Sequence, residues 1–245
     1  MVTCYDAWSA RIIAATDIDC ILVGDSVAMV MHGHETTIPA DVDMMRLHVA
    51  AVRRGAPERL LVADMPFLAH RKGLGPAMEA VDLLMKAGAQ GVKIEGAGDT
   101  VDLVRHIVDS GVPVMGHLGL TPQSIHAFGG YRVQGRNEGA AATIRADALR
   151  LQQAGCFALV LEVVPGALAA EITAALDIPT IGIGAGPSTS GQVLVLQDLL
   201  GMQPEFRPHF LRTFLDGFEL VRDALARYDE AVKTGAYPSA EESYR

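Results

Sequence analysis

The chain has 245 residues, of which 50% are hydrophobic and 20% are charged, and its formal net charge is −9. This length suits one large α/β domain or two small ones, and the composition is that of a globular protein without a disordered tract. Lys and Arg form no stripe along the sequence, which argues against a nucleic-acid partner. No apolar run approaches the roughly 18 residues needed to span a bilayer, which argues against a membrane protein.

The three cysteines, Cys4, Cys20 and Cys156, form no CxxC motif and no even disulfide framework. Cys20 and Cys156 lie in or beside apolar runs, so buried and reduced thiols are expected, as is usual in the cytosol. The N-terminus has no basic segment followed by an apolar stretch and a cleavage site. We therefore expect a cytoplasmic protein.

Strand-like and helical patterns alternate almost from end to end. In chain order, the expected strands span residues 1–4, 20–23, 60–63, 91–94, 112–115, 157–161, 180–183 and 193–196. The expected helices span residues 7–15, 41–54, 75–87, 100–110, 140–154 and 165–176, with about two more between 206 and 233. Asp6 and either Asp41 or Asp43 are candidate N-caps, and Gly55 and Gly88 are candidate helix ends.

The turns that enter three of the strands are short and contain Gly or Pro, whereas the loops that leave the strands are longer and hold the polar residues. This asymmetry is typical of the α/β class and its (β/α)8 TIM barrel, whose chemistry lies at the carboxyl ends of the strands. A doubly wound open sheet is the competing architecture. Because there is no internal repeat and no linker, we expect one barrel domain over residues 1–245, with extra C-terminal helices from about residue 206.

Four of the expected strands run into a carboxylate: Asp25, Asp64, Glu95 and Glu162. Parallel strands all finish on one face, so these acids would converge, and their repulsion is costly unless a cation or a proton-transfer role compensates. Asp25, Asp64 and Glu95, with no cysteine cluster nearby, suit Mg²⁺ better than Zn²⁺. Glu162 has apolar sequence neighbours, which favours a proton-accepting role. For each acid taken alone, a helix cap or an ordinary structural carboxylate is the alternative.

Three further polar residues are candidates for holding a substrate. Lys93 shares a strand face with Glu95, and an inward-pointing lysine is expensive unless an acid or an anionic substrate pairs with it. Ser26 could grip a carboxylate oxygen, or it could only form a turn. His117 is expected to begin the loop after the strand at 112–115, where it could orient a substrate or have a purely structural role.

Several ordered blocks then point to one family. They are residues 23–26, 51–55, 63–67, 92–96, 116–123, 128–131, 133–136, 161–162 and 181–186. In these blocks the chain resembles the ketopantoate hydroxymethyltransferase family, in order from about Thr3 to Pro238. The block around His117, which reads Gly-His-Leu-Gly-Leu-Thr-Pro-Gln, is highly specific. The resemblance implies a (β/α)8 barrel of the phosphoenolpyruvate/pyruvate-binding type and self-association, in this family often as a homodecamer.

The resemblance also implies a reaction and residue roles. The expected enzyme transfers a hydroxymethyl group from 5,10-methylenetetrahydrofolate to 3-methyl-2-oxobutanoate through a Mg²⁺-stabilised enolate, giving 2-dehydropantoate in pantothenate biosynthesis. Asp25 and Asp64 match direct Mg²⁺ ligands that also touch the 2-oxo acid, and Glu95 matches the third acid of the metal site. Ser26 and Lys93 match the groups that hold the 2-oxo acid, and Glu162 matches the catalytic base.

Two other readings remain open at this point. One is a different Mg²⁺-dependent enzyme of the same barrel superfamily, a lyase or mutase acting on a C4 to C6 oxo acid without folate. The other is a non-catalytic metabolite-binding or scaffold protein on a decayed barrel, against which the retention of all the matched polar positions argues.

Overall fold

The structure is a computed structural model, and it describes residues 1–244. It contains two compact units, Met1–Val195 and the segment that begins at Leu196. The first unit is built around the strands, and the second holds the C-terminal helices α9 (Leu196–Leu199) and α10 (Gly217–Lys233).

Eight parallel strands form one sheet in which each strand pairs with the next in the sequence. They are β1 (Val2–Thr3), β2 (Cys20–Val23), β3 (Leu60–Asp64), β4 (Gly91–Glu95), β5 (Val114–Gly119), β6 (Ala158–Glu162), β7 (Thr180–Ile183) and β8 (Gly191–Gln192). Val2 pairs with Leu194 in a parallel bridge, and the Thr3 amide donates to the Leu194 carbonyl over 3.1 Å. The sheet therefore returns to its first strand, and the predicted (β/α)8 barrel is confirmed over the doubly wound alternative.

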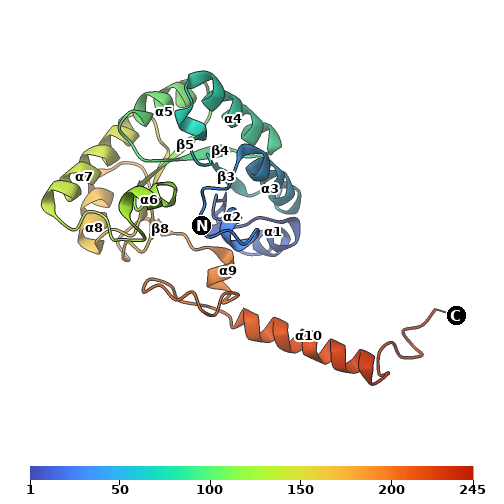
Figure 1. The fold of residues 1–245 in the computed structure, drawn as a ribbon. Coiled ribbons are helices and arrows are strands. Elements are labelled where there is room, and N and C mark those ends of the chain that lie inside the picture. Colours follow the sequence, from blue (N-terminus) through green and yellow to red (C-terminus); the bar gives the residue numbers. More distant parts are fainter. Residues whose placement is uncertain (245) are drawn as a thin grey trace. The chain divides into compact units, whose positions relative to one another are not determined.

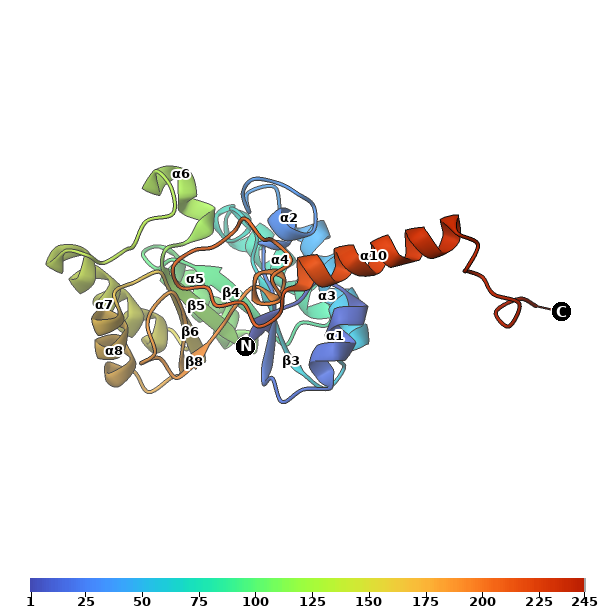
Figure 2. The same ribbon diagram turned by 90° about the horizontal axis from the view of Figure 1, so that it is seen from below.

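Helices lie around the outside of the strands in Figure 1, and Figure 2 shows the same arrangement from below. They are α1 (Ala7–Ala14), α3 (Val42–Gly55), α4 (Leu74–Ala87), α5 (Thr100–Asp109), α7 (Glu138–Gln153) and α8 (Gly166–Ala175). The short helices α2 (Val27–Val30) and α6 (Ile125–Phe128) belong to the loops that follow β2 and β5. Two short 3₁₀ helices, η1 (Ala69–Arg71) and η2 (Pro122–Ser124), lie in the loops that follow β3 and β5.

The helix ends follow the local signals of the sequence. Asp6 and Asp41 are in extended conformation, and their side chains accept from the Ser9 and Met44 amides, as N-caps do. Gly88 ends α4 in the left-handed conformation. Gly55 differs, because it is the last residue of α3 and a Cβ there would lie 2.4 Å from the Ala7 carbonyl oxygen. Its small size is needed for the packing of α3 against α1.

Alternation along the strands divides the barrel interior into an apolar and a charged part. The apolar interior layer consists of Cys20, Leu22, Val62, Met115, Ala158 and Val160. Two residues further along β3, β5 and β6, the same inward face carries Asp64, His117 and Glu162. Because side chains two apart share a face, each of these strands supplies apolar packing first and a polar group at its carboxyl end.

Strand β5 begins later and extends further than the sequence pattern predicted. The expected strand at 112–115 is replaced by Val114–Gly119, because Pro113 has no N–H to donate to a ladder. His117 consequently lies inside the strand, paired in register with Glu95 and Val160, and the prediction that it begins the following loop is wrong.

Two predictions near the C-terminus also need correction. The apolar run at 193–196 is not a strand, because β8 ends at Gln192, Leu194 bridges to β1, and Leu196 begins α9. About two helices were expected between 206 and 233, but the structure has α10 alone there, and residues 206–216 are not helical. Pro208 is incompatible with a helix interior, which accounts for part of this difference.

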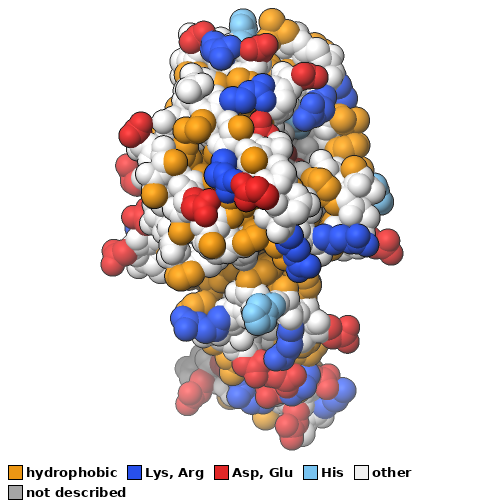
Figure 3. Space-filling model, turned by 90° about the vertical axis from the view of Figure 1, so that its left-hand side faces the viewer, with side chains coloured by type: hydrophobic (Ala, Val, Ile, Leu, Met, Phe, Trp, Pro, Cys, Tyr) orange, Lys and Arg blue, Asp and Glu red, His pale blue; other side chains and the backbone are white. Residues whose placement is uncertain are grey.

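The surface agrees with the charge pattern of the sequence. The face that carries α7 and α8 has acidic and basic side chains interspersed, without a broad basic patch (Figure 3). On this face Arg145 pairs with Glu171 over 2.9 Å and also with Glu138. Within residues 1–244, no helix combines the length and the apolarity that crossing a membrane requires.

Candidate active site

The strand-end acids converge, as the sequence predicted. Asp25 lies two residues after the end of β2. Asp64 and Glu95 are the last residues of β3 and β4. The Asp25 amide donates to Asp64 Oδ2 over 3.0 Å, and Lys93 Nζ lies 2.9 Å from Asp64 Oδ1. All four side chains are buried, with no more than 5% of their surface exposed. A buried cluster with more carboxylates than cations therefore lies at the carboxyl end of the barrel.

His117 joins two parts of this cluster. Its Nδ1 atom lies 3.0 Å from Lys93 Nζ and 3.3 Å from Glu95 Oε1, and its Nε2 atom lies 3.1 Å from Glu162 Oε2. Lys93 and Glu95 thus both reach His117, as expected for residues on one face of β4. Glu162 was expected among apolar neighbours only, but β5 places the His117 ring beside it. The Glu162 side chain is 17% exposed, so it is the acid of this group that solvent reaches.

Gln123 donates hydrogen bonds to two of the acids. Its side-chain amide donates to Asp25 Oδ2 over 2.8 Å and to the Met65 carbonyl over 2.9 Å, and its backbone amide donates to Glu95 Oε2 over 3.1 Å. Gln123 lies in η2, in the loop that follows the strand carrying His117. It fixes carboxylates from two different strands relative to each other.

Ser26 lies at the edge of the cluster and is only partly buried. Its hydroxyl is 2.7 Å from the Tyr5 hydroxyl, which belongs to the loop after β1. Gly24 lies close to both Ser26 and Asp64. A Cβ on Gly24 would be 3.1 Å from Ser26 Oγ and 3.4 Å from Asp64 Oδ2. A side chain at position 24 would thus occupy the space beside the Ser26 hydroxyl.

The charges of the cluster shift its pKa values in opposite directions. Burial raises the pKa of Asp25 well above its ordinary value, and the charges of Asp64 and Glu95 raise it further. Burial likewise raises the pKa of Asp64, although the Lys93 ammonium opposes the shift. Burial would lower the pKa of Lys93, but the surrounding carboxylates outweigh it and raise that pKa. The cluster therefore has an excess of negative charge that one lysine does not neutralise.

Glu95 and His117 stabilise each other's charged forms. Burial would raise the pKa of Glu95, but the hydrogen bond and charge of His117, together with Lys93, hold it below its ordinary value. Burial and Lys93 lower the pKa of His117, but contacts with Glu162 and Glu95 outweigh them, so its pKa lies at about 9. A protonated His117 can form an ion pair with each of these two acids, whereas Lys93 can donate to Nδ1 only when the ring is neutral.

The donor set is compatible with a hard divalent cation. Asp25, Asp64 and Glu95 offer carboxylate oxygens, which Mg²⁺ prefers, and their mutual repulsion is what such an ion would relieve. Lys93 and Gln123 contact these oxygens in the structure. Within residues 1–244, no three His, Cys, Asp or Glu side chains are already arranged around a common point as a metal site. Binding would therefore require these oxygens to exchange some of their present contacts.

The comparisons with known proteins bear directly on this site. The family model described as ketopantoate hydroxymethyltransferase matches residues 1–240. The chain belongs to the ketopantoate hydroxymethyltransferase family. This membership confirms the resemblance found in the sequence.

Individual relatives cover nearly the whole chain. A 3-methyl-2-oxobutanoate hydroxymethyltransferase from Bdellovibrio bacteriovorus is 59% identical over 100% of this chain and 93% of its own length. A protein of the same name from Coxiella burnetii (strain CbuG_Q212) is 57% identical over 98% of this chain and 91% of its own length.

Solved structures share the fold at much lower identity. A phosphonopyruvate hydrolase in complex with oxalate and Mg²⁺ has a TM-score of 0.63 and 9% identity, and the match covers 98% of this chain and 87% of that chain. A 2,3-dimethylmalate lyase, described as a member of the PEP mutase/isocitrate lyase superfamily, has a TM-score of 0.57 and 17% identity, with 95% and 80% of the two chains covered. These two likenesses support the barrel fold.

Sequence reasoning missed some residues that this family member brings to the site. Tyr5 lies two residues after the end of β1 and its side chain is buried, so the strand-end rule could have found it, but the rule was applied to charged residues only. Gln123 lies in the most specific block of the resemblance, yet nothing in its neighbourhood indicated that it reaches Asp25, which is 98 residues away in the chain.

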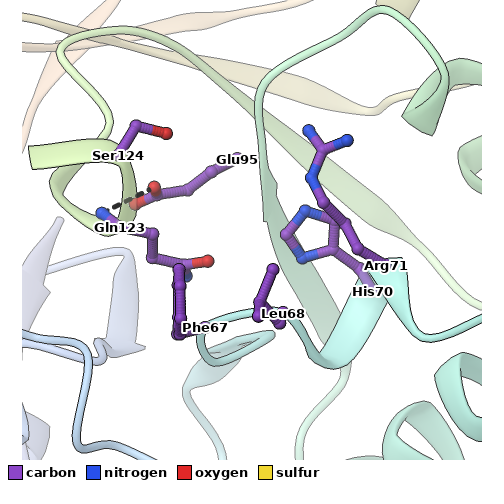
Figure 4. Close-up of a pocket in the computed structure, with 7 residues that line it drawn as sticks. All are labelled: Phe67, Leu68, His70, Arg71, Glu95, Gln123 and Ser124. Carbon is purple, nitrogen blue, oxygen red and sulfur yellow. Dashed lines mark hydrogen bonds between the residues drawn. The ribbon is translucent and has the colours of Figure 1, made fainter. Parts of the chain in front are cut away.

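A small pocket adjoins the cluster on the side of Glu95 and Gln123 (Figure 4). Its volume is about 110 Å³, and it is lined by Phe67, Leu68, His70, Arg71, Glu95, Gln123 and Ser124. In Figure 4, His70 and Arg71 lie together on one side, across from the hydrogen-bonded Glu95 and Gln123. Sequence reasoning did not connect His70 and Arg71 with the site, because they follow the end of β3 by several residues.

Proposed function

We propose that the protein transfers a hydroxymethyl group from 5,10-methylenetetrahydrofolate to 3-methyl-2-oxobutanoate, giving 2-dehydropantoate for pantothenate biosynthesis. The observation that carries this proposal is the buried cluster of Asp25, Asp64, Lys93, Glu95 and His117 beside Glu162, in a chain of the ketopantoate hydroxymethyltransferase family. Such a cluster offers both a cation site and a proton acceptor within one strand-end layer.

Lys93 and Ser26 hold the carboxylate of the oxo acid in this proposal. Lys93 is buried and already carries a positive charge among the acids, so its ammonium can pair with a further anionic oxygen. The Ser26 hydroxyl is positioned by Tyr5 at the less buried edge of the cluster. The two groups together orient the substrate relative to Glu162.

Asp25 and Asp64 are the proposed direct ligands of Mg²⁺, and Glu95 is the third acid of the site. When bound there, Mg²⁺ would polarise the keto group and stabilise the negative charge that develops on its oxygen. Gln123 keeps Asp25 and Glu95 in place from the opposite side. In this arrangement Lys93 would bind the carboxylate of the substrate, and the metal site would bind its keto group.

Glu162 is the proposed base that removes the proton from C3 of the oxo acid. His117 Nε2 lies 3.1 Å from its carboxylate and orients it. The resulting carbon nucleophile forms a C–C bond with the one-carbon unit, whose bonds to the folate nitrogens break. One water supplies the hydroxyl oxygen, and tetrahydrofolate leaves as the second product.

Exchange of the C3 proton with deuterated water tests the central step without the folate. Glu162→Gln should abolish this exchange while the oxo acid still binds, and Glu171→Gln on the exposed surface of α8 should leave it unchanged. Retained exchange in Glu162→Gln would refute the assignment of the base. An enzyme that turns the oxo acid over without methylenetetrahydrofolate would instead be a lyase or mutase.

We further propose that α10 associates with a second copy of this chain, within a homodecamer. Phe218, Val221, Leu225, Tyr228 and Val232 recur at alternating spacings of three and four residues along one face of the helix. All five are between 41% and 63% exposed. This is the heptad spacing of helices that pack against each other. Leu225→Glu should reduce the mass measured by sedimentation, whereas Leu220→Glu, which lies off this face, should not.

We also propose a cytoplasmic location. In the structure Cys4, Cys20 and Cys156 are buried free thiols, which accords with a reducing compartment. Alkylation of unfolded protein taken directly from cells should modify all three cysteines, and recovery of a disulfide would contradict the proposal.

A further inference from the structure

The pocket beside Glu95 contains polar groups that have no partner in the fold. Arg71 is exposed, and its guanidinium forms no hydrogen bond or ion pair with any of residues 1–244. His70 is only 7% exposed, and neither of its ring nitrogens has a hydrogen-bond partner. A buried polar group without a partner is costly, so the ring of His70 points to a ligand that is polar itself, and the exposed Arg71 guanidinium beside it is free to pair with that ligand.

The charges around the pocket indicate the sign of that ligand. Arg71 supplies a positive charge with five N–H donors, and Ser124 offers a hydroxyl. Burial and the nearby Arg71 charge lower the pKa of His70 to about 4, so its neutral ring provides one N–H donor. Glu95 is the one acid of the lining, and it is already engaged by Gln123 and His117. The unengaged groups therefore favour an anion with oxygen acceptors.

The position and size of the pocket narrow the choice of anion. A Cβ on Gly96 would lie 3.5 Å from Arg71 Nη2, so the guanidinium lies over the residue that follows Glu95. Lys93 and Ser26, which hold the oxo acid in the proposed function, are not part of the lining. The pocket is small, at about 110 Å³, which suits a terminal group of a ligand rather than a whole folate.

We propose that this pocket binds a glutamyl carboxylate of the one-carbon donor, with Arg71 as its ionic partner and His70 as a hydrogen-bond donor. The inference rests on the proposed function, since it assigns the second substrate of that same site. Phe67 and Leu68 provide an apolar wall for the hydrocarbon part of the same tail. In a protein with a net charge of −9, this unpaired cation also attracts an anionic donor to the mouth of the barrel.

The test compares two donors and three substitutions. The donors are 5,10-methylenetetrahydrofolate and an analogue whose glutamate is replaced by a neutral methyl amide. Arg71→Gln should raise the KM for the natural donor about tenfold or more, because a charge-assisted hydrogen bond is lost, and should not change the KM for the neutral analogue. Arg71→Lys should give an intermediate value, because the charge stays but the planar fork is lost. Lys72→Gln removes the same charge one residue away, outside the lining, and should have no effect.

A binding measurement makes the test independent of turnover. Calorimetric titration of tetrahydrofolate into the Mg²⁺-loaded protein should show the same weakening for Arg71→Gln. His70→Gln, checked for native circular dichroism, should show a smaller weakening. Equal effects of Arg71→Gln on the two donors, or no effect on either, would overturn the inference. Acetate that competes equally with both donors would also overturn it, because the pocket would then be a general anion site.

The C3 exchange reaction separates this inference from the proposed function. Exchange needs the oxo acid and Mg²⁺ but not the donor. If the wild-type protein shows no exchange, the proposed function fails. If exchange is normal and Arg71→Gln does not alter donor binding, the function stands and only the assignment of the pocket fails.

Discussion

The two layers of the barrel interior are formed by the same strands but have opposite energetics. The apolar layer, which includes Leu22, Val62 and Met115, is almost fully buried and stabilises the fold by removing hydrocarbon from water. The charged layer two residues further along contains Asp64, Lys93 and His117, and burial opposes the charge of each of them. The same strands therefore supply apolar side chains that stabilise the fold at one level, and charged side chains whose burial is unfavourable at the next.

The largest effect should come from an acid in the charged layer. Asp25→Asn should lower kcat/KM by about a thousandfold, because several kcal/mol of charge stabilisation by the metal are lost. Since burial and two neighbouring carboxylates disfavour ionised Asp25, the same change should not lower the stability of the metal-free protein. Steady-state kinetics and urea unfolding would measure the two effects, with exposed Asp43→Asn as control. A variant that keeps activity would contradict the charged layer's proposed role.

Removal of the buried Lys93 side chain should, in contrast to Asp25→Asn, lower the stability of the metal-free protein. Lys93→Met leaves the ionised acids without their cation, and the free energy of unfolding at pH 7 should fall by about 3–5 kcal/mol. A second substitution, Asp64→Asn, should restore much of the loss, because it removes the carboxylate that Lys93 contacts. Urea unfolding of the single and double variants measures this coupling. If the double variant is no more stable than Lys93→Met, the two residues are not energetically linked.

In the apolar layer, a truncation should affect stability and spare the chemistry. Leu22→Ala should cost about 3 kcal/mol of unfolding free energy, through lost burial and the cavity left behind. The activity of the fraction that remains folded should stay near the wild-type value. Leu47→Ala, at a position that is 64% exposed, should cost less than about 1 kcal/mol. A large loss of activity in stably folded Leu22→Ala would show that the two layers are not separable.

The smallest effect concerns pH and the buried imidazole beside the charged layer. The pKa of His70 is lowered to about 4 by burial and by Arg71, whereas in the unfolded chain it is about 6.5. Between these values the unfolded state binds more protons, so the free energy of unfolding is full well above pH 6.5 and is lower by about 2 kcal/mol at pH 5. His70→Gln should flatten this part of the stability profile, and exposed His106→Gln should leave it unchanged. An unaltered profile in His70→Gln would show that His70 is not the group responsible.

Much of the charged layer could be predicted because it follows from local rules. Asp64, Glu95 and Glu162 each end an apolar run, and parallel strands bring such ends to one face of the barrel. His117 was placed wrongly at the start of a loop, because pairing with β4 and β6 keeps its segment in the sheet. Gly116 packs closely there, since a Cβ would lie 3.0 Å from terminal methyl groups of Leu151 and Leu159.

By itself, the sequence determined the alternation of strands and helices, the capped helix starts, and the level at which Asp25, Asp64 and Glu95 lie, because these depend on spacing along a few residues. Only the tertiary structure decided that Gln123 reaches Asp25, that His117 contacts Glu162, and that His70 and Arg71 are left without partners beside Glu95. Those contacts depend on strand register and on the path of long loops, which arise from packing between segments that are distant in the chain.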